Sequence, residues 1–302
     1  MKKNMNTGWL VAGAAAAGAV CCSLVRKKKE KDRDYSGYGK TVLITGASSG
    51  IGMEFADVFA SNGFDVVLTA RSEEKLKSIA RDIEFNYPVN ADVIPADLST
   101  AEGVDILYNT VKQRGIRIDQ LVNNAGTGVF GSTVDVDTDK LSELIQLNIT
   151  SVTLLCRLFG ADMKQRHEGR ILNVASLGAF MPDPYFNVYG PSKAYELYLT
   201  EAMSGELRSS GVSMSVLCPG PVRTGLAKKL GKAESRFALT TREVAEAGFR
   251  GMQSGELIII PNWKFHLLKD VICHLPVRCR IAFIRAWQEH LLANGPDDIF
   301  RN

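Results

Sequence analysis

From Lys40 onward, the chain alternates short runs of β-branched and apolar residues with longer stretches in which apolar residues recur every three or four positions. The short runs predict buried strands and the longer stretches predict amphipathic helices. Strands separated by helices form a parallel sheet that is covered on both faces. Seven runs predict strands: residues 41–45, 65–70, 91–96, 120–125, 170–176, 213–219 and 256–261. The expected fold is a doubly wound α/β domain with its ligand site at the carboxyl ends of the strands.

The N-terminal segment is of a different kind. Residues 7–25 carry no charge, and the run RKKKEKDR follows at once. A helix of this length spans about 28 Å, close to the hydrocarbon core of a bilayer at roughly 30 Å. We therefore expect residues 1–34 to be a single-pass membrane anchor whose basic flank leaves the catalytic domain cytoplasmic. A cleaved secretory signal is the alternative, because AGA at 17–19 is a passable cleavage site.

Composition narrows the class of protein further. The 302 residues are 45% hydrophobic, enough for one large domain after the N-terminal segment. Of the net charge of +3, residues 1–34 contribute eight basic minus three acidic residues, or +5, so residues 35–302 carry −2. That balance argues against a nucleic-acid partner for the main domain. The six cysteines and four histidines lack the spacings of a metal site or of a dense disulfide framework, so no metal is expected.

A glycine-rich turn, TGASSGIG at 45–52, joins the first predicted strand to the first predicted helix. Its glycines permit a tight turn and close backbone approach, while the helix start offers free N–H groups to a pyrophosphate. The spacing G-x-x-x-G-x-G departs from the common G-x-G-x-x-G fingerprint, and a sharp connection alone is the competing interpretation. At this junction of a Rossmann-type sheet, the turn predicts a dinucleotide site.

The second predicted strand ends in LTARSEE. A free ribose 2′-OH favours an acidic side chain at such a place, whereas a 2′-phosphate favours a cation. Ala70 leaves the acidic place empty and Arg71 supplies a guanidinium suited to a phosphate. NADP(H) is therefore expected in preference to NAD(H), with a solvated loop arginine as the competing interpretation.

The sequence YGPSK places Tyr189 and Lys193 on one face of a helix. A free tyrosine has a pKa near 10, and a neighbouring cation lowers that pKa by favouring the phenolate. Lys193 would thus make Tyr189 a usable acid or base. Ser176, which ends the fifth predicted strand, could hydrogen-bond the same substrate oxygen. Taken singly, each would be an ordinary core tyrosine, surface lysine or strand-end cap.

Together these motifs resemble the short-chain dehydrogenase/reductase family over residues 40 to about 262. The motifs are TGASSGIG, ADL at 96–98, NNAG at 123–126, LNIT around Asn148, NVAS ending at Ser176, YGPSK, and PGPVRT at 219–224. The resemblance implies a catalytic set of Asn148, Ser176, Tyr189 and Lys193. In that set Asn148 holds a relay water, and Lys193 also contacts the nicotinamide ribose.

The resemblance also implies the cofactor contacts. Asp97 and Leu98 would flank the adenine. Asn123 and Gly126 would line the cleft, and Thr224 would reach the carboxamide. The whole predicted set is Gly46, Ser48, Ser49, Gly50, Ile51, Gly52, Arg71, Asp97, Leu98, Asn123, Ala125, Gly126, Tyr189, Lys193, Pro219, Gly220, Val222 and Thr224.

In this family, segments such as 180–188 and 223–240 shape the substrate pocket, and FMPDPYFNV is rich in aromatic residues and Met. An apolar carbonyl or alcohol, such as a steroid, retinoid or fatty-acyl compound, is expected, although aromatic residues near a cleft are also normal core. Residues 263–302 form a C-terminal helical extension beyond the catalytic domain at 35–262. Its helices suit docking on the sheet, a membrane surface, a cap over the cleft or a dimer contact. A homo-oligomer is expected.

Two classes of function follow. The first is an NADP(H)-dependent oxidoreductase that reduces a carbonyl or oxidises a secondary alcohol at a membrane. The second is a nucleotide-binding sensor or membrane scaffold on the same fold without significant turnover. The complete set of Asn148, Ser176, Tyr189 and Lys193 favours the first class, because a sensor has no need of a tuned tyrosine.

Overall fold

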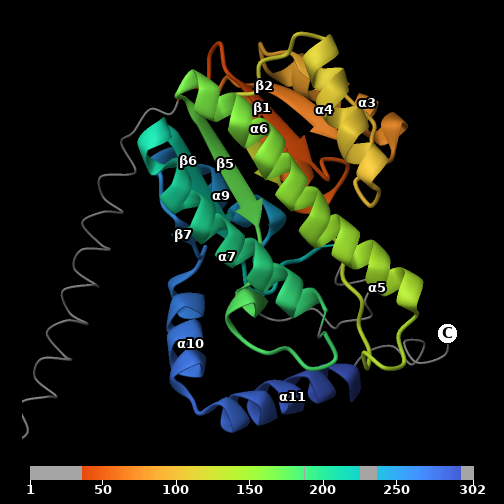
Figure 1. The fold of residues 1–302 in the computed structure, drawn as a ribbon, viewed down its shortest axis with the longest axis vertical. Helices are drawn as coiled ribbons and strands as arrows, with labels where there is room; N and C mark the ends of the chain where they lie inside the picture. The colour runs from red at the N-terminus through yellow and green to blue at the C-terminus, as the bar shows by residue number, and fades with distance from the viewer. Residues whose placement is uncertain (1–35, 187, 225–236, 294–302) are drawn as a thin grey trace, which may run out of the picture. The chain divides into compact units, whose positions relative to one another are not determined.

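The computed structural model describes residues 36–186, 188–224 and 237–293, which belong to one compact unit (Figure 1). The predicted anchor at 1–34 lies outside the described residues, as do residues 225–236 of the predicted substrate segment.

A seven-stranded parallel sheet with the order β3-β2-β1-β4-β5-β6-β7 forms the centre of the unit. Its strands are β1 (Thr41–Thr45), β2 (Asp65–Thr69), β3 (Ala91–Val93), β4 (Gln120–Asn123), β5 (Gly169–Val174), β6 (Val212–Leu217) and β7 (Ile258–Ile259). All seven predicted strands are confirmed. Six of them end one to three residues earlier than predicted, because their last residues leave the sheet to form loops at its carboxyl edge.

Helices cover both faces of the sheet, as the alternating pattern predicts. They are α2 (Gly50–Ser61), α3 (Glu73–Asn86), α4 (Ala101–Gln113), α5 (Thr138–Ile145), α6 (Val152–Arg166), α7 (Tyr189–Leu207) and α9 (Thr241–Ser254). Figure 1 shows α6 and α7 in front of β5 and α9 behind it. On the α9 side, Phe59 and Phe249 meet edge to face with ring centroids 4.9 Å apart, which joins α2 to α9. The other face buries a continuous apolar cluster from α4, α6 and the strands.

A single helical stretch, Thr138–Arg166, contains α5, the π-helical turn η1 (Gln146–Ser151) and α6. It is the one described helix that is long and apolar enough to cross a membrane, with a mean hydropathy of 1.4. In that apolar window 44% is buried inside the unit, and core helices of soluble proteins can be equally long and apolar. Its length and composition therefore do not distinguish a spanning segment from a core helix.

The C-terminal extension forms α10 (Trp263–His274) and α11 (Val277–Ala293), separated at Pro276. Phe265 of α10 is buried against Gly220, where a Cβ would lie 2.7 Å from the Phe265 ring. From α11, Glu289 accepts a hydrogen bond from the Tyr185 hydroxyl at 3.0 Å. The extension thus docks on the sheet domain and contacts the segment that precedes Tyr189.

Candidate active site

The carboxyl ends of neighbouring strands lie side by side, as the parallel register requires. In that register Thr45 pairs with Thr69, Asn123 with Asn173, and Val174 with Leu217. The loops after β1, β4, β5 and β6 therefore meet at one edge of the sheet. These loops carry most of the predicted site residues.

The turn between β1 and α2 has the geometry of a phosphate cradle. Gly46 and Gly50 adopt positive φ angles of 66° and 59°, which glycine reaches without strain. A Cβ on Gly52 would approach the Gly46 carbonyl oxygen to 2.3 Å, so only glycine fits there. Ser49 caps α2 through its backbone and makes no side-chain capping bond. The first N–H groups of α2 are thus available to an anion.

Two residues absent from the predicted set hold this turn in place. The Thr45 hydroxyl accepts hydrogen bonds from the backbone N–H groups of Asn124 and Ala125, each at 2.9 Å. The Asn124 amide donates to the Thr45 carbonyl at 2.9 Å. The sequence could have indicated these two residues by their position, because each lies where a strand ends beside the glycine turn.

The side chains of two predicted cofactor residues face the interior of the protein. The side chain of Asn123 is buried and donates to Asn173 Oδ1 at 2.9 Å. Leu98 belongs to the apolar core. Their contacts with a cofactor would therefore come from the backbone, since a side chain cannot face the core and the cleft together.

Asp97 is exposed, and its carboxylate accepts hydrogen bonds from the Ser99 N–H at 3.0 Å and the Ser99 hydroxyl at 2.7 Å. Burial raises the pKa of Asp97, but the Ser99 hydrogen bonds and the charge of Arg71 outweigh it and leave the pKa lowered. Arg71 itself is exposed, with 67% of its side chain accessible, and lies 3.5 Å from Glu143 Oε1. The arginine is therefore open to a ligand at this edge.

The segment after β6 begins with Pro219 and Gly220, two residues of the predicted cofactor set. The Pro219 carbonyl accepts from the Leu177 N–H at 2.8 Å, which ties this turn to the loop that carries Ser176. Val222 forms an isolated parallel bridge with Leu239. Thr224 is half-buried at the limit of the described residues.

The four predicted catalytic residues come from three separate elements. Asn148 lies in the π-helical turn η1 and is fully buried. Its amide donates to the Thr127 carbonyl at 2.9 Å and to the Ser192 hydroxyl at 3.0 Å. A Cβ on Gly126 would lie 3.3 Å from Lys193 Nζ and 3.4 Å from Asn148 Oδ1, so both side chains converge on Gly126.

Ser176 and Tyr189 meet at their hydroxyls. Ser176 follows β5 and begins the 3₁₀ turn η2 (Leu177–Phe180), while Tyr189 opens α7. A hydrogen bond from the Ser176 side chain favours the phenolate of Tyr189. The Lys193 ammonium lies 5.8 Å from the centroid of the Tyr189 ring. The serine, tyrosine and lysine thus form one cluster, with the phenol at its centre.

A buried carboxylate that the sequence analysis did not single out completes this cluster. Glu196 Oε1 accepts a hydrogen bond from Lys193 Nζ at 2.6 Å, and the Val174 carbonyl accepts a second at 2.9 Å. The signal in the sequence is an acidic residue three positions after Lys193, on the same helical face.

The electrostatics differ from the expectation for Tyr189. Burial raises the pKa of the phenol, the Lys193 charge lowers it, and the Glu196 charge raises it again, which leaves the pKa above its ordinary value. Lys193 acts in the predicted direction, but desolvation and the second charge prevail. In the cofactor-free protein the phenol therefore holds its proton, which suits an acid in carbonyl reduction.

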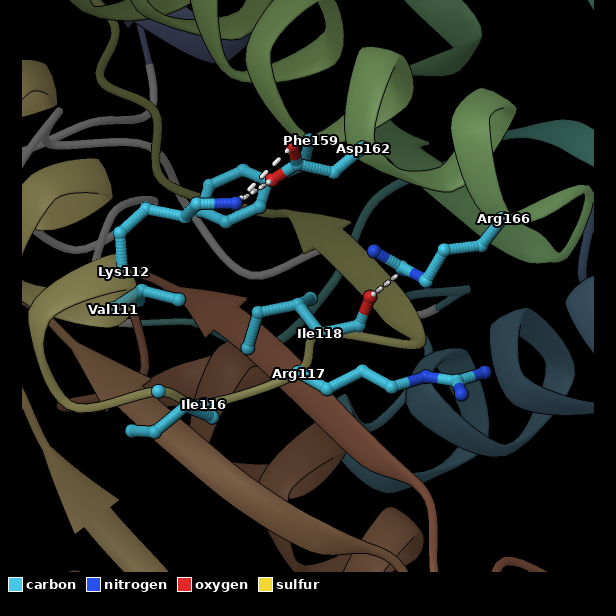
Figure 2. Close-up of a pocket in the computed structure, with 9 residues that line it drawn as sticks. Val111, Lys112, Ile116, Arg117, Ile118, Phe159, Asp162 and Arg166 are labelled. Carbon is cyan, nitrogen blue, oxygen red and sulfur yellow. Dashed lines mark hydrogen bonds and ion pairs between the residues drawn. The ribbon is translucent and has the colours of Figure 1, made fainter.

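A separate pocket of about 290 Å³ is lined by none of the predicted site residues (Figure 2). Its lining includes Ile118, which precedes β4, so it opens at the amino ends of the strands. Its charged side chains are already paired: Lys112 with Asp162 at 3.2 Å, Arg166 with the Ile118 carbonyl at 2.7 Å, and Arg117 with Glu168 outside the lining at 2.7 Å. This pocket is not the cofactor site.

A dinucleotide cradle beside a serine–tyrosine–lysine cluster defines an oxidoreductase that acts on CH–OH or C=O groups with a nicotinamide dinucleotide. The sequence model described as short chain dehydrogenase matches residues 40–235. The chain belongs to the short-chain dehydrogenase/reductase family.

Individual relatives agree with this assignment. Human 17-beta-hydroxysteroid dehydrogenase type 3 is 31% identical over 91% of this chain and 96% of its own length. Very-long-chain 3-oxoacyl-CoA reductase of Anas platyrhynchos is 32% identical over 77% of each protein. Another relative, hydroxysteroid dehydrogenase-like protein 1 of Gallus gallus, is covered over only 57% of its length. A short-chain dehydrogenase from Sphingobium yanoikuyae in complex with NADPH superposes with a TM-score of 0.70 at 29% identity, covering 85% of this chain and 97% of that one.

Proposed function

We propose that the chain is a membrane-anchored, NADP(H)-dependent reductase of an apolar carbonyl compound. The observation that carries the proposal is the convergence of Asn148, Ser176, Tyr189 and Lys193 beside the cradle formed by Gly46 and Gly52. The cradle fits a dinucleotide because the glycines keep the turn tight, with no room for a Cβ on Gly46 or Gly52, and the first N–H groups of α2 are left for a pyrophosphate. When bound there, the reduced nicotinamide supplies a hydride.

The protein supplies the proton and the orientation. Tyr189 donates its phenolic proton to the substrate oxygen, while Ser176 hydrogen-bonds the same oxygen and stabilises the charge that develops on it. Lys193, whose ammonium lies 5.8 Å from the centroid of the Tyr189 ring, and Asn148 would return a proton to the phenol.

An exposed arginine supports the preference for NADP(H). Arg71 follows β2, and its guanidinium is exposed to solvent beside Asp97. Ala70 stands at the position where an acidic residue would favour a free ribose 2′-OH. A 2′-phosphate would compete with Glu143 for this guanidinium and offer it a stronger, bidentate partner. The proposed Arg71 contact is therefore electrostatic and specific to the phosphorylated cofactor.

An aromatic wall supports the apolar substrate. Phe130 and Phe186 lie with ring centroids 5.7 Å apart, and Phe186 stacks on Tyr189. A carbonyl compound that reaches the phenol would meet these rings. The names of two relatives, a hydroxysteroid dehydrogenase and a very-long-chain 3-oxoacyl-CoA reductase, describe substrates with large apolar bodies.

Turnover of a panel of steroid, retinoid and fatty-acyl ketones and alcohols, each with NADPH and with NADH, tests the proposal. Reduction of at least one class, faster with NADPH, is expected. Dinucleotide binding without turnover of any compound would instead favour the sensor or scaffold. Sedimentation of the purified protein tests whether it is a homo-oligomer, as we propose. The proposed membrane anchor is residues 1–34.

A further inference from the structure

Helix α7 buries an ion pair where an amphipathic helix normally buries apolar residues. Lys193 and Glu196 are 4% and 1% exposed, on the buried face that also carries Leu197 and Thr200. Neither the cofactor cradle nor the proton transfer described above uses the Glu196 carboxylate. Its position must therefore be explained separately.

The geometry fixes one orientation of the lysine. Glu196 at 2.6 Å and the Val174 carbonyl at 2.9 Å take two of the three N–H donors of the Lys193 ammonium. The third donor is left for the side of the site where Gly126 and Asn148 lie. Glu196 thus holds the ammonium between the interior and the cofactor cleft.

Stability alone explains this pair poorly. Removing two charges from water is costly, and replacing a buried ion pair with apolar residues of similar volume is often neutral or stabilising. The carboxylate also meets few other charges. Among the described residues, those that sense it are Tyr189 and Lys193 on α7, Cys156 on α6 and Cys218 after β6.

The two thiols take no part in this charge balance. Burial raises the pKa of Cys156 and of Cys218 to about 12, so both remain neutral. Burial lowers the pKa of Lys193, but the charges of Glu196 and Tyr189 raise it by more. The pKa therefore stays above its ordinary value and the ammonium keeps its charge. Burial raises the pKa of Glu196 to about 7 against the opposing pull of Lys193. Lys193 is therefore the charge that Glu196 offsets.

We propose that Glu196 is a positioning residue that acts through Lys193, offsetting its charge so that Tyr189 keeps its proton to higher pH and remains available as the acid in carbonyl reduction. This role rests on the proposed function. In the reduction, the O–H bond of Tyr189 breaks and its proton passes to the substrate oxygen. The carbonyl carbon gains the hydride and its electron pair from the reduced nicotinamide, which is thereby oxidised. A proton from solvent then restores the phenol.

The first test is a titration of the cofactor-free protein, which requires no turnover. Tyrosinate absorbance is followed against pH in wild type, Glu196→Gln and Glu196→Met, each with and without Tyr189→Phe, so that the difference isolates Tyr189. Besides Lys193 and Glu196, this phenol faces Ser176 and Asp183, which stay in every variant. Loss of the carboxylate should move the midpoint down by about one pH unit. Glu206→Gln, an exposed glutamate on the same helix, should not move it.

The second test is kinetic. Reduction needs the protonated phenol, so its kcat/KM falls as pH rises through the pKa of Tyr189, whereas oxidation needs the phenolate and its kcat/KM rises. In Glu196→Gln both limbs should shift to lower pH by the same amount, and Glu196→Asp, which keeps the charge, should restore most of the wild-type profile. A structural role would lower the rates without moving the profile.

Unshifted titration midpoints in Glu196→Gln and Glu196→Met would overturn the role of Glu196. Failure of both variants to fold would also overturn it, because the carboxylate would then be needed for the structure. Absence of turnover in wild type would instead count against the proposed function, and the absorbance titration would still decide the role of Glu196.

Discussion

The ring of Phe186 stacks on the ring of Tyr189, with centroids 4.2 Å apart and 28° between the planes. Gly128 makes room for this stack, because a Cβ there would lie 2.9 Å from Phe186. The phenol is therefore held by apolar contacts on its ring and by polar contacts at its oxygen. These two contributions can be separated by mutation.

Tyr189→Phe should reduce kcat/KM by about 100- to 10,000-fold, because the ring stays packed while the transferable proton is lost. The affinity for NADPH, measured by fluorescence titration, should be nearly unchanged. Tyr198→Phe is the matched control, since Tyr198 lies on the same helix and is 68% exposed. Substantial activity in Tyr189→Phe would show that another group is the acid.

Arg71→Asp should reverse the cofactor preference by at least about tenfold in the ratio of kcat/KM for NADPH to that for NADH. The change removes the phosphate partner and adds repulsion against the 2′-phosphate, while an aspartate can accept from a ribose hydroxyl. Arg81→Asp, on the exposed side of α3, is the control. An unchanged ratio would mean that Arg71 is only a surface residue.

Gly52→Ala should weaken dinucleotide binding and destabilise the fold, because its Cβ would meet the Gly46 carbonyl oxygen at 2.3 Å. Overpacking of this kind costs about 1–3 kcal/mol. Gly205→Ala on α7 is the contrast: nothing lies within 4 Å of its Cβ, so stability should hold or rise by roughly 0.5–1 kcal/mol. Denaturant unfolding measures the change in stability, and NADPH titration measures the change in affinity. Equal changes in Gly52→Ala and Gly205→Ala would contradict the cradle geometry.

Phe265→Ala should destabilise the protein by about 3 kcal/mol, because the ring joins α10 to Gly220 and the adjoining apolar cluster. Trp263→Ala, at a site 63% exposed on the same helix, should cost far less. Thermal unfolding distinguishes the two. Similar losses would indicate that α10 is not docked through its buried face.

Deletion of residues 1–34 should give a soluble and active enzyme, since the charge-free stretch and its basic flank precede β1 and include none of the predicted site residues. The full-length chain should remain in the membrane pellet after an alkaline wash, with its catalytic domain open to protease on the cytoplasmic face. Cleavage after about Ala19 and secretion would refute the anchor. A truncated chain that is still membrane-bound would point to residues 263–292 as a second membrane contact.

The order of residues alone determined the class of fold and the chemical groups of the site. Short apolar, β-branched runs and the 3.6-residue period of amphipathic helices are local patterns, so the seven strands and their intervening helices could be read from the sequence. The helical spacing of Tyr189 and Lys193 is likewise local. So is the glycine turn at 45–52, whose positive φ angles depend on residue type more than on distant neighbours.

Only the tertiary structure decided which side chains face one another. The strand order, the inward turn of Asn123 and the docking of Phe265 against Gly220 depend on elements far apart in the chain. The raised pKa of Tyr189 has the same origin: desolvation and the Glu196 charge oppose Lys193, and neither can be weighed until the helix is packed. The spacing of two residues in the sequence predicts that they share one face of a helix. The pKa values of those residues also depend on the dielectric around them, which is set by all the groups that cover that face.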